Sequence, residues 1–160
     1  MSGDTDPATA DPSRFELAQV NIGRLLAPVD SPRIAEFVAA LDPINRLADG
    51  SPGFVWRLQT AEGNATAIHS FEDDLIISNM SVWASIEALR AFTYSSAHTS
   101  IMSRRREWFS KYVTAYMALW WVPAGHRPTI EEAKGRLDLL DHLGPTSEAF
   151  TFRVPFQPPE

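Results

Sequence analysis

The chain has 160 residues, of which 44% are apolar and 21% charged, and these values are ordinary for one globular domain. Its net charge of −6 argues against a nucleic-acid-binding protein, which normally carries a basic face. It contains no cysteine, which excludes disulfides, thiolate metal sites and cysteine nucleophiles and suits a cytoplasmic location. No stretch approaches the roughly 18 apolar residues that a membrane span needs.

The N-terminal part of the chain predicts a tail followed by alternating elements. Residues 1–13 are acidic and proline-rich, so we expect a disordered tail before a single domain at residues 14–156. A strand is predicted at 15–25, where Leu17, Gln19 and Asn21 share one face. A helix capped near Ser31 should follow through about residue 48, with a kink or break at Pro43.

The rest of the chain continues the alternation. After a turn, a short strand is predicted at 54–58, and a strand at 75–85 places Ile77, Asn79, Ser81 and Trp83 on one face. Helices are expected at 86–92 and 97–111. The apolar run 116–122 predicts a strand that is covered on both faces. Thr129 and Glu132 form a capping-box pattern that begins a last helix, and 150–154 predicts a last strand.

The predicted order of elements is β-α-β-β-α-β with an added C-terminal helix and strand. This is the order of the ferredoxin-like α+β fold. Its four-stranded sheet carries helices on one face only, so the other face needs a cover. We expect a second copy of the chain to provide it, which predicts a homodimer.

Several motifs resemble the dimeric α+β-barrel superfamily. The junction Trp83-Ala84-Ser85-Ile86-Glu87-Ala88-Leu89, followed by Ser95-Ser96-Ala97-His98, resembles the antibiotic-biosynthesis and haem-degrading monooxygenases. Residues 17–21 (LAQVN), 52–58 (PGFVWRL), 79–83 (NMSVW) and 120–126 (WWVPAGH) resemble a bacterial family of unknown function within that superfamily. The resemblance extends over residues 17–155 and implies a fold, but a fold does not determine a reaction.

The resemblance also implies a site. It suggests a small-molecule oxygenase whose pocket lies between sheet and helices and accepts an aromatic or polyketide-like substrate. His98 would transfer a proton or bind haem iron, and Trp83 with Asn21 or Asn79 would line the cavity. Each residue has a structural alternative, namely a main-chain-bonded histidine, a core tryptophan or a satisfied amide. No cofactor is expected, and haem is the alternative.

Four further residues are candidates for ligand binding. Arg57 is a charge within a mostly apolar strand and needs a partner, and Trp56 lies beside it. His126 lies in a turn, and Arg104 belongs to a run of three arginines that is more often a solvated face. The four histidines lack metal-ligand spacing, so no metal site is predicted. A non-catalytic haem- or small-molecule-binding dimer and a structural scaffold remain the alternative functions.

Overall fold

The computed structural model describes residues 14–58, 75–110 and 116–159, so the predicted tail at 1–13 lies outside the described residues. Its four strands form one sheet in the order β2-β3-β1-β4, in which all neighbours are antiparallel. The strands are β1 (Phe15–Arg24), β2 (Phe54–Arg57), β3 (Ile76–Trp83) and β4 (Met117–Pro123). The helices are α1 (Ala35–Asp49), α2 (Ile86–Thr93), α3 (Ser96–Met102) and α4 (Ile130–Leu143), with short 3-10 helices η2 (Pro32–Ile34) and η3 (Arg105–Glu107).

This arrangement confirms the predicted ferredoxin-like α+β fold. The central strands β1 and β3 are adjacent and antiparallel, and the flanking strands β4 and β2 lie outside them. The chain therefore forms β1-α1-β2-β3-α2-β4, with α3 and η3 inserted after α2 and α4 added after β4.

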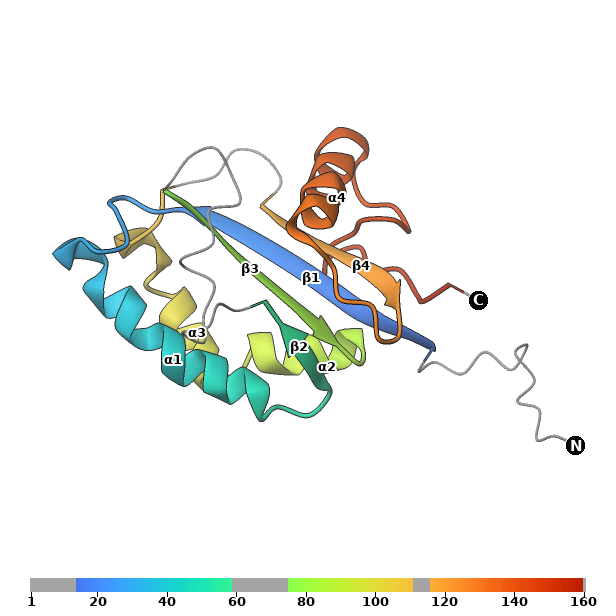
Figure 1. The fold of residues 1–160 in the computed structure, drawn as a ribbon, viewed down its shortest axis with the longest axis horizontal. Helices are drawn as coiled ribbons and strands as arrows, with labels where there is room; N and C mark the ends of the chain where they lie inside the picture. The colour runs from blue at the N-terminus through green and yellow to red at the C-terminus, as the bar shows by residue number, and fades with distance from the viewer. Residues whose placement is uncertain (1–13, 59–74, 111–115, 160) are drawn as a thin grey trace, which may run out of the picture.

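The helices α1, α2 and α3 cover one side of the sheet through two separate apolar clusters (Figure 1). What we call the α2 cluster lies at the end of the sheet where β3 meets α2. The Trp108 cluster lies at the other end, where β1 leaves the sheet. The buried members of the α2 cluster are Leu17, Ala48, Trp83, Ile86, Leu89, Leu119 and Phe150. Those of the Trp108 cluster are Leu25, Ile34 and Trp108, against which Phe37, Ile77, Ile101 and Phe109 pack.

The fourth helix, α4, lies across the sheet from the other three (Figure 1) and packs on the opposite face of the strands. The resulting α4 cluster joins alternate residues of β1, β3 and β4 to one side of α4. Its buried members are Ala18, Val20, Ile22, Met80, Val82, Ala118, Trp120, Val122, Ala133, Leu137, Leu140 and Ala149. The apolar strand β4 is thus covered on both faces within one chain. Covering this face was the reason to expect a second copy, so the homodimer stays a prediction without that support.

Three local expectations differ from the structure. The helix expected at 97–111 is divided into α3 and η3, and its expected end lies outside the described residues. Of the kink or break expected at Pro43, the break does not occur, since α1 continues from Ala35 to Asp49. Both Pro43 and Ala39, whose carbonyl would have accepted the missing hydrogen bond, are exposed, so water can satisfy that carbonyl.

The predicted last strand is the third difference. At this position the chain forms one isolated bridge, in which Leu119 and Phe150 exchange hydrogen bonds of 2.8 Å. Beyond it, Phe152 and Phe156 pack on the α2 cluster, and Trp121 Nε1 donates to the Phe156 carbonyl at 2.8 Å. Residues 150–156 therefore form an irregular arm that covers the helix-facing side of β4.

Candidate functional site

Polar side chains occupy the helix-facing side of the sheet between the α2 cluster and the Trp108 cluster. They come from three adjacent strands, and we call them the polar strip: Gln19, Asn21, Arg57, Asn79 and Ser81. The strand register places Gln19 and Arg57 on either side of Ser81, and pairs Asn21 with Asn79. Side chains alternate between the faces of a strand, so the strip shares its face with both apolar clusters.

Gln19 connects the strip. Its Nε2 donates to Asn79 Oδ1 and to Ser81 Oγ, both at 2.7 Å, and its Oε1 accepts from Asn21 Nδ2 at 3.2 Å. Only 3% of Gln19 is exposed, so each of these bonds has a buried amide as donor or acceptor. Such a network holds its members in fixed orientations, because a buried amide that loses a partner is costly.

The strip runs from a buried end to an exposed end. Gln19 and Ser81 are buried, whereas Asn21 and Asn79 are exposed. The two asparagines nevertheless lie in the middle strands, on the face that the helices cover. Their amides are thus accessible at the centre of this face, with an apolar cluster on either side. A few fixed polar groups among apolar side chains are a feature that small-molecule sites share.

Arg57 closes the β2 side of the strip with a bidentate ion pair. Its Nε lies 2.7 Å from Asp49 Oδ1, and one terminal nitrogen donates to Asp49 Oδ2 at 3.2 Å. The Arg57 side chain is 11% exposed and Asp49 43%. Asp49 is the last residue of α1, so the pair ties this helix to β2 beside the strip.

Trp83 supports the strip from inside the α2 cluster. It is 1% exposed and donates from Nε1 to Ser81 Oγ at 2.8 Å. Its ring stacks on Phe92 and meets Phe54 edge-on, with centroids 5.3 Å away in both cases. The sequence suggested that Trp83 lines an open cavity, but neighbouring side chains occupy the space around its ring. Its link to the exposed asparagines runs through Ser81 and Gln19.

His98 lies in the first turn of α3 and is bonded to the main chain. Its Nδ1 donates to the Thr93 carbonyl at 2.9 Å, and its ring contacts Phe92 at 5.1 Å between centroids. Burial lowers the pKa of His98, and the Thr93 bond opposes this only in part, so the imidazole is neutral at pH 7 with a bare Nε2. Within the described parts of the chain, His98 has no hydrogen bond to the strip, although it shares the inward face of α3 with Ile101.

A groove of about 500 Å³ has Phe92 in its lining. Small residues of the α1–β2 turn and of α2 line it, and its hydroxyl groups are used in local bonds: Ser51 donates to the Leu47 carbonyl, and Ser85 caps α2.

Haem would need an axial ligand and cations for its propionates. Among the described residues that line the groove, Glu87 alone is charged and His98 is absent, so this lining does not fit haem. Among the described residues, no group of three or more potential metal ligands occurs.

Two of the ligand-binding candidates lie on the opposite face of the sheet. Trp56 pairs with Val82 and packs on the α4 cluster, so it points away from Arg57 and the strip. His126 donates from Nε2 to Glu132 Oε1 at 2.7 Å, and Glu132 Oε2 accepts from Trp120 Nε1 at 2.9 Å. The WWVPAGH motif therefore fixes the beginning of α4, and both residues have structural roles.

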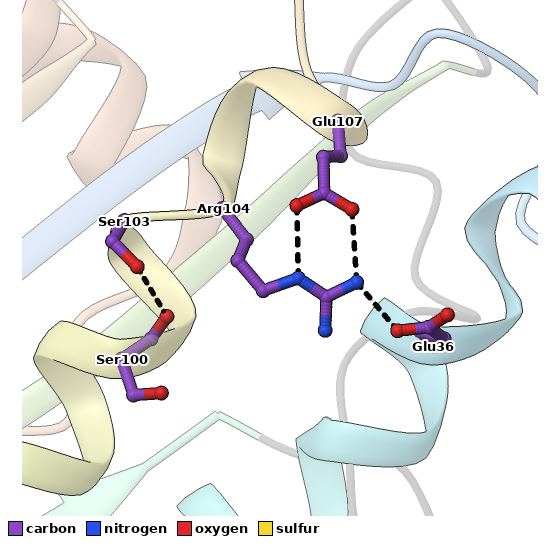
Figure 2. Close-up of polar contacts among 5 residues, drawn as sticks. All are labelled: Glu36, Ser100, Ser103, Arg104 and Glu107. Atoms are coloured by element: carbon purple, nitrogen blue, oxygen red, sulfur yellow. Dashed lines mark hydrogen bonds and ion pairs between the residues drawn. The ribbon is translucent and has the colours of Figure 1, made fainter.

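Arg104 is a clamp between helices. Figure 2 shows its guanidinium between two carboxylates: Nε and a terminal nitrogen bind Glu107 at 2.9 and 2.8 Å, and the same terminal nitrogen binds Glu36 of α1. The hydrogen bonds of Glu107 and Glu36 raise the pKa of Arg104 above its usual range. The guanidinium also lies 4.8 Å above the Trp108 ring. With these partners, Arg104 joins α1 to η3 and is separate from the strip.

The structure thus brings together Asn21, Asn79 and Arg57, and it adds two residues that sequence reasoning did not select, Gln19 and Ser81. The signal for both was present in the alternation. Each lies two positions from a selected residue on the same strand face, and each is polar where an apolar residue would be expected.

A family model described as a domain of unknown function (DUF3291) matches residues 16–160. No curated protein matches the sequence. A conserved protein from Methanosarcina mazei Go1 is 13% identical with a TM-score of 0.47, over 70% of this chain and 95% of its own. SnoaB, a cofactor-independent oxygenase from Streptomyces nogalater, is 17% identical with a TM-score of 0.43, over 71% and 95%. A protein from Pseudomonas aeruginosa is 9% identical with a TM-score of 0.47, over 73% and 98%.

Proposed function

The chain belongs to the DUF3291 family, as its motifs suggested, and we propose that it binds a small aromatic molecule on the polar strip and promotes its reaction with O₂. One observation carries this proposal. Two exposed amides, Asn21 and Asn79, lie at the centre of the helix-covered face and are held by the buried Gln19. A site of this kind offers apolar contact to a ring and hydrogen bonds to its oxygen substituents.

The chemistry that the strip supports is stabilisation of an anion. The outward amide donor of the strip favours an oxyanion on a bound phenol or enol. An electron-rich substrate that ionises easily can transfer electrons to O₂ directly. In the simplest balanced reaction, a ring CH₂ and O₂ give a ring C=O and water, with both hydrogens of the water coming from the substrate. The protein supplies a partly dry site and the hydrogen bonds.

In this proposal His98 receives the substrate proton. Its neutral imidazole keeps Nε2 free to accept, while the Thr93 bond fixes the ring orientation. His98→Ala should then lower the turnover rate and leave binding of the probe unchanged. Equal loss of both would point to a structural role for this residue.

The test uses 1,8-dihydroxyanthrone as the probe, with O₂ uptake followed at an electrode. We expect the protein to accelerate uptake and Asn79→Ala to lower this acceleration about tenfold or more. Asn45→Ala, at a position on α1 outside the strip, is the matched control and should keep it. Uptake no faster than without protein, or the same in both variants, would contradict the proposal.

Non-catalytic binding is the second candidate function. The burial of Trp83 and the main-chain bond of His98 favour it, because both residues already have structural roles. This function predicts that the probe binds at the strip without O₂ uptake.

A cytoplasmic location, a homodimeric state and independence from a cofactor remain predictions from the sequence. The described residues contain no helix that is both long and apolar enough to cross a bilayer.

A further inference from the structure

The hydrogen bonds within the polar strip determine which amide atoms its two exposed asparagines present outward. Gln19 uses its amide nitrogen on Asn79 Oδ1 and its amide oxygen on Asn21 Nδ2. The amide atoms left at the exposed end are therefore Asn79 Nδ2, a donor, and Asn21 Oδ1, an acceptor. Neither of these two atoms bonds to another residue in the described part of the chain.

This opposite polarity does not depend on which way the Gln19 amide is turned. Turning it by 180° exchanges its oxygen and nitrogen, so both asparagines must turn with it to keep their bonds. Asn79 Oδ1 and Asn21 Nδ2 then face outward. The exposed end again offers one acceptor and one donor, because one carboxamide connects the two asparagines.

We propose that Gln19 is a specificity-determining positioning residue, which makes the strip select ligands that offer an acceptor and a donor on neighbouring atoms. A primary carboxamide and a hydroxy-ketone belong to this class. The inference rests on the proposed function, in that the ligand lies on the strip. Asn21 and Asn79 are paired across neighbouring strands, which brings their side chains close enough for one planar group to reach both.

Symmetric groups fit this end less well. A carboxylate offers two acceptors, so one of its oxygens would face the outward carbonyl of an asparagine. An amidinium offers two donors, so one would face the outward amide nitrogen. In both cases one polar atom is desolvated without a partner, which costs affinity.

The experiment compares benzamide, benzoate and benzamidinium as probes, titrated by NMR against the full chain. We expect the wild type to bind benzamide about tenfold more tightly than either charged probe, the equivalent of one hydrogen bond. Gln19→Glu presents two acceptor oxygens, so both asparagines turn their nitrogens inward and their carbonyls outward. Its preference should move to benzamidinium.

Two variants separate this effect from charge and from folding. Gln157→Glu adds the same charge at an exposed position directly after the C-terminal arm and should keep the preference for benzamide. Gln19→Met keeps the side-chain length without polar ends and should lose the preference without gaining one for benzamidinium. If Gln19→Glu does not fold, the result for Gln19→Met alone tests the inference.

The outcomes distinguish this inference from the proposed function. If the wild type binds no probe at the strip, the proposed function fails together with the inference. If it binds benzoate as tightly as benzamide, or if Gln19→Met keeps the preference, the inference is overturned and the strip remains a binding site.

Discussion

At the scale of single residues, β3 carries two buried serines that face opposite sides of the sheet. Ser81 Oγ accepts hydrogen bonds from Gln19 Nε2 and from Trp83 Nε1. Ser78 Oγ is buried on the α4 side and has no hydrogen-bond partner among the described residues. The two serines are thus similarly buried on the same strand, but the hydroxyl group of Ser81 has hydrogen-bond partners and that of Ser78 has none among the described residues.

This pair gives a matched test of the strip's internal bonds. Ser81→Ala leaves the buried Trp83 Nε1 without an acceptor, so we expect the free energy of unfolding to fall by about 1–3 kcal/mol. Ser78→Ala removes an unpartnered hydroxyl and should be neutral or slightly stabilising. Urea unfolding of both variants is the measurement. Equal losses in the two variants would show that the Ser81 bonds do not stabilise the fold.

The sequence could indicate the face of the strip but not its connections. Alternation places Asn79 and Trp83 on one side of β3, and the structure agrees. The bonds of Gln19 depend on the register between β1 and β3, which is set by long-range pairing. Arg104 shows the same limit, because its partner Glu36 lies 68 positions away in the sequence.

At the scale of elements, the beginning of α4 is fixed by one carboxylate. Thr129 Oγ1 caps the helix by accepting from the Glu132 amide at 3.1 Å, as the capping pattern predicts. The Glu132 carboxylate accepts hydrogen bonds from Trp120 Nε1 and His126 Nε2. Burial favours a higher pKa for Glu132, but the hydrogen bonds from His126 and Trp120 outweigh it and hold this pKa below its usual value.

Glu132→Gln should therefore destabilise the protein in a pH-dependent way. Because the pKa of Glu132 is lower in the folded than in the unfolded state, its ionised carboxylate stabilises the fold above the unfolded pKa of about 4.5. This stabilisation is lost as the pH falls through the folded-state pKa. We expect a loss of about 1–3 kcal/mol at pH 7, measured by thermal unfolding, that shrinks below about pH 4.5. Glu131→Gln, in the same helical turn but exposed, should change little. A loss independent of pH would rule out the charged bonds as its cause.

Local sequence patterns were sufficient for the four strands and for α1, α2 and α4, with alternation in β1 and β3 and a continuous apolar run in β4. They failed at residues 150–154, where Phe150, Phe152 and Val154 alternate as in a strand. The alternation there reflects rings that pack on the α2 cluster. In this segment only Phe150 pairs with a strand residue, Leu119. Alternating buried residues therefore do not show by themselves that a segment joins a sheet.

At the scale of the whole molecule, α4 occupies the sheet face where a partner was expected. Val20 and Trp120, at the centre of this face, are fully buried in a single chain. Stacking two sheets face to face would require α4 to leave. A homodimer, if it forms as the resemblance predicts, must then use another surface.

We accordingly expect the thermal midpoint to be the same at 5 and 200 μM protein, to within about 1 °C, because no partner is needed to cover the core. Differential scanning calorimetry at the two concentrations, with sedimentation velocity for the mass, makes the comparison. A midpoint that rises clearly with concentration would show that association stabilises the fold and would contradict this expectation.

The measurement that tests the account most directly is an NMR titration of the ¹⁵N-labelled protein with 1,8-dihydroxyanthrone under nitrogen, which prevents turnover. We predict that the side-chain amide signals of Asn21 and Asn79 shift together and saturate, and that Asn79→Ala weakens the binding seen at Asn21. Signals that stay unchanged, or that shift only around the groove beside Phe92, would contradict a ligand site on the polar strip.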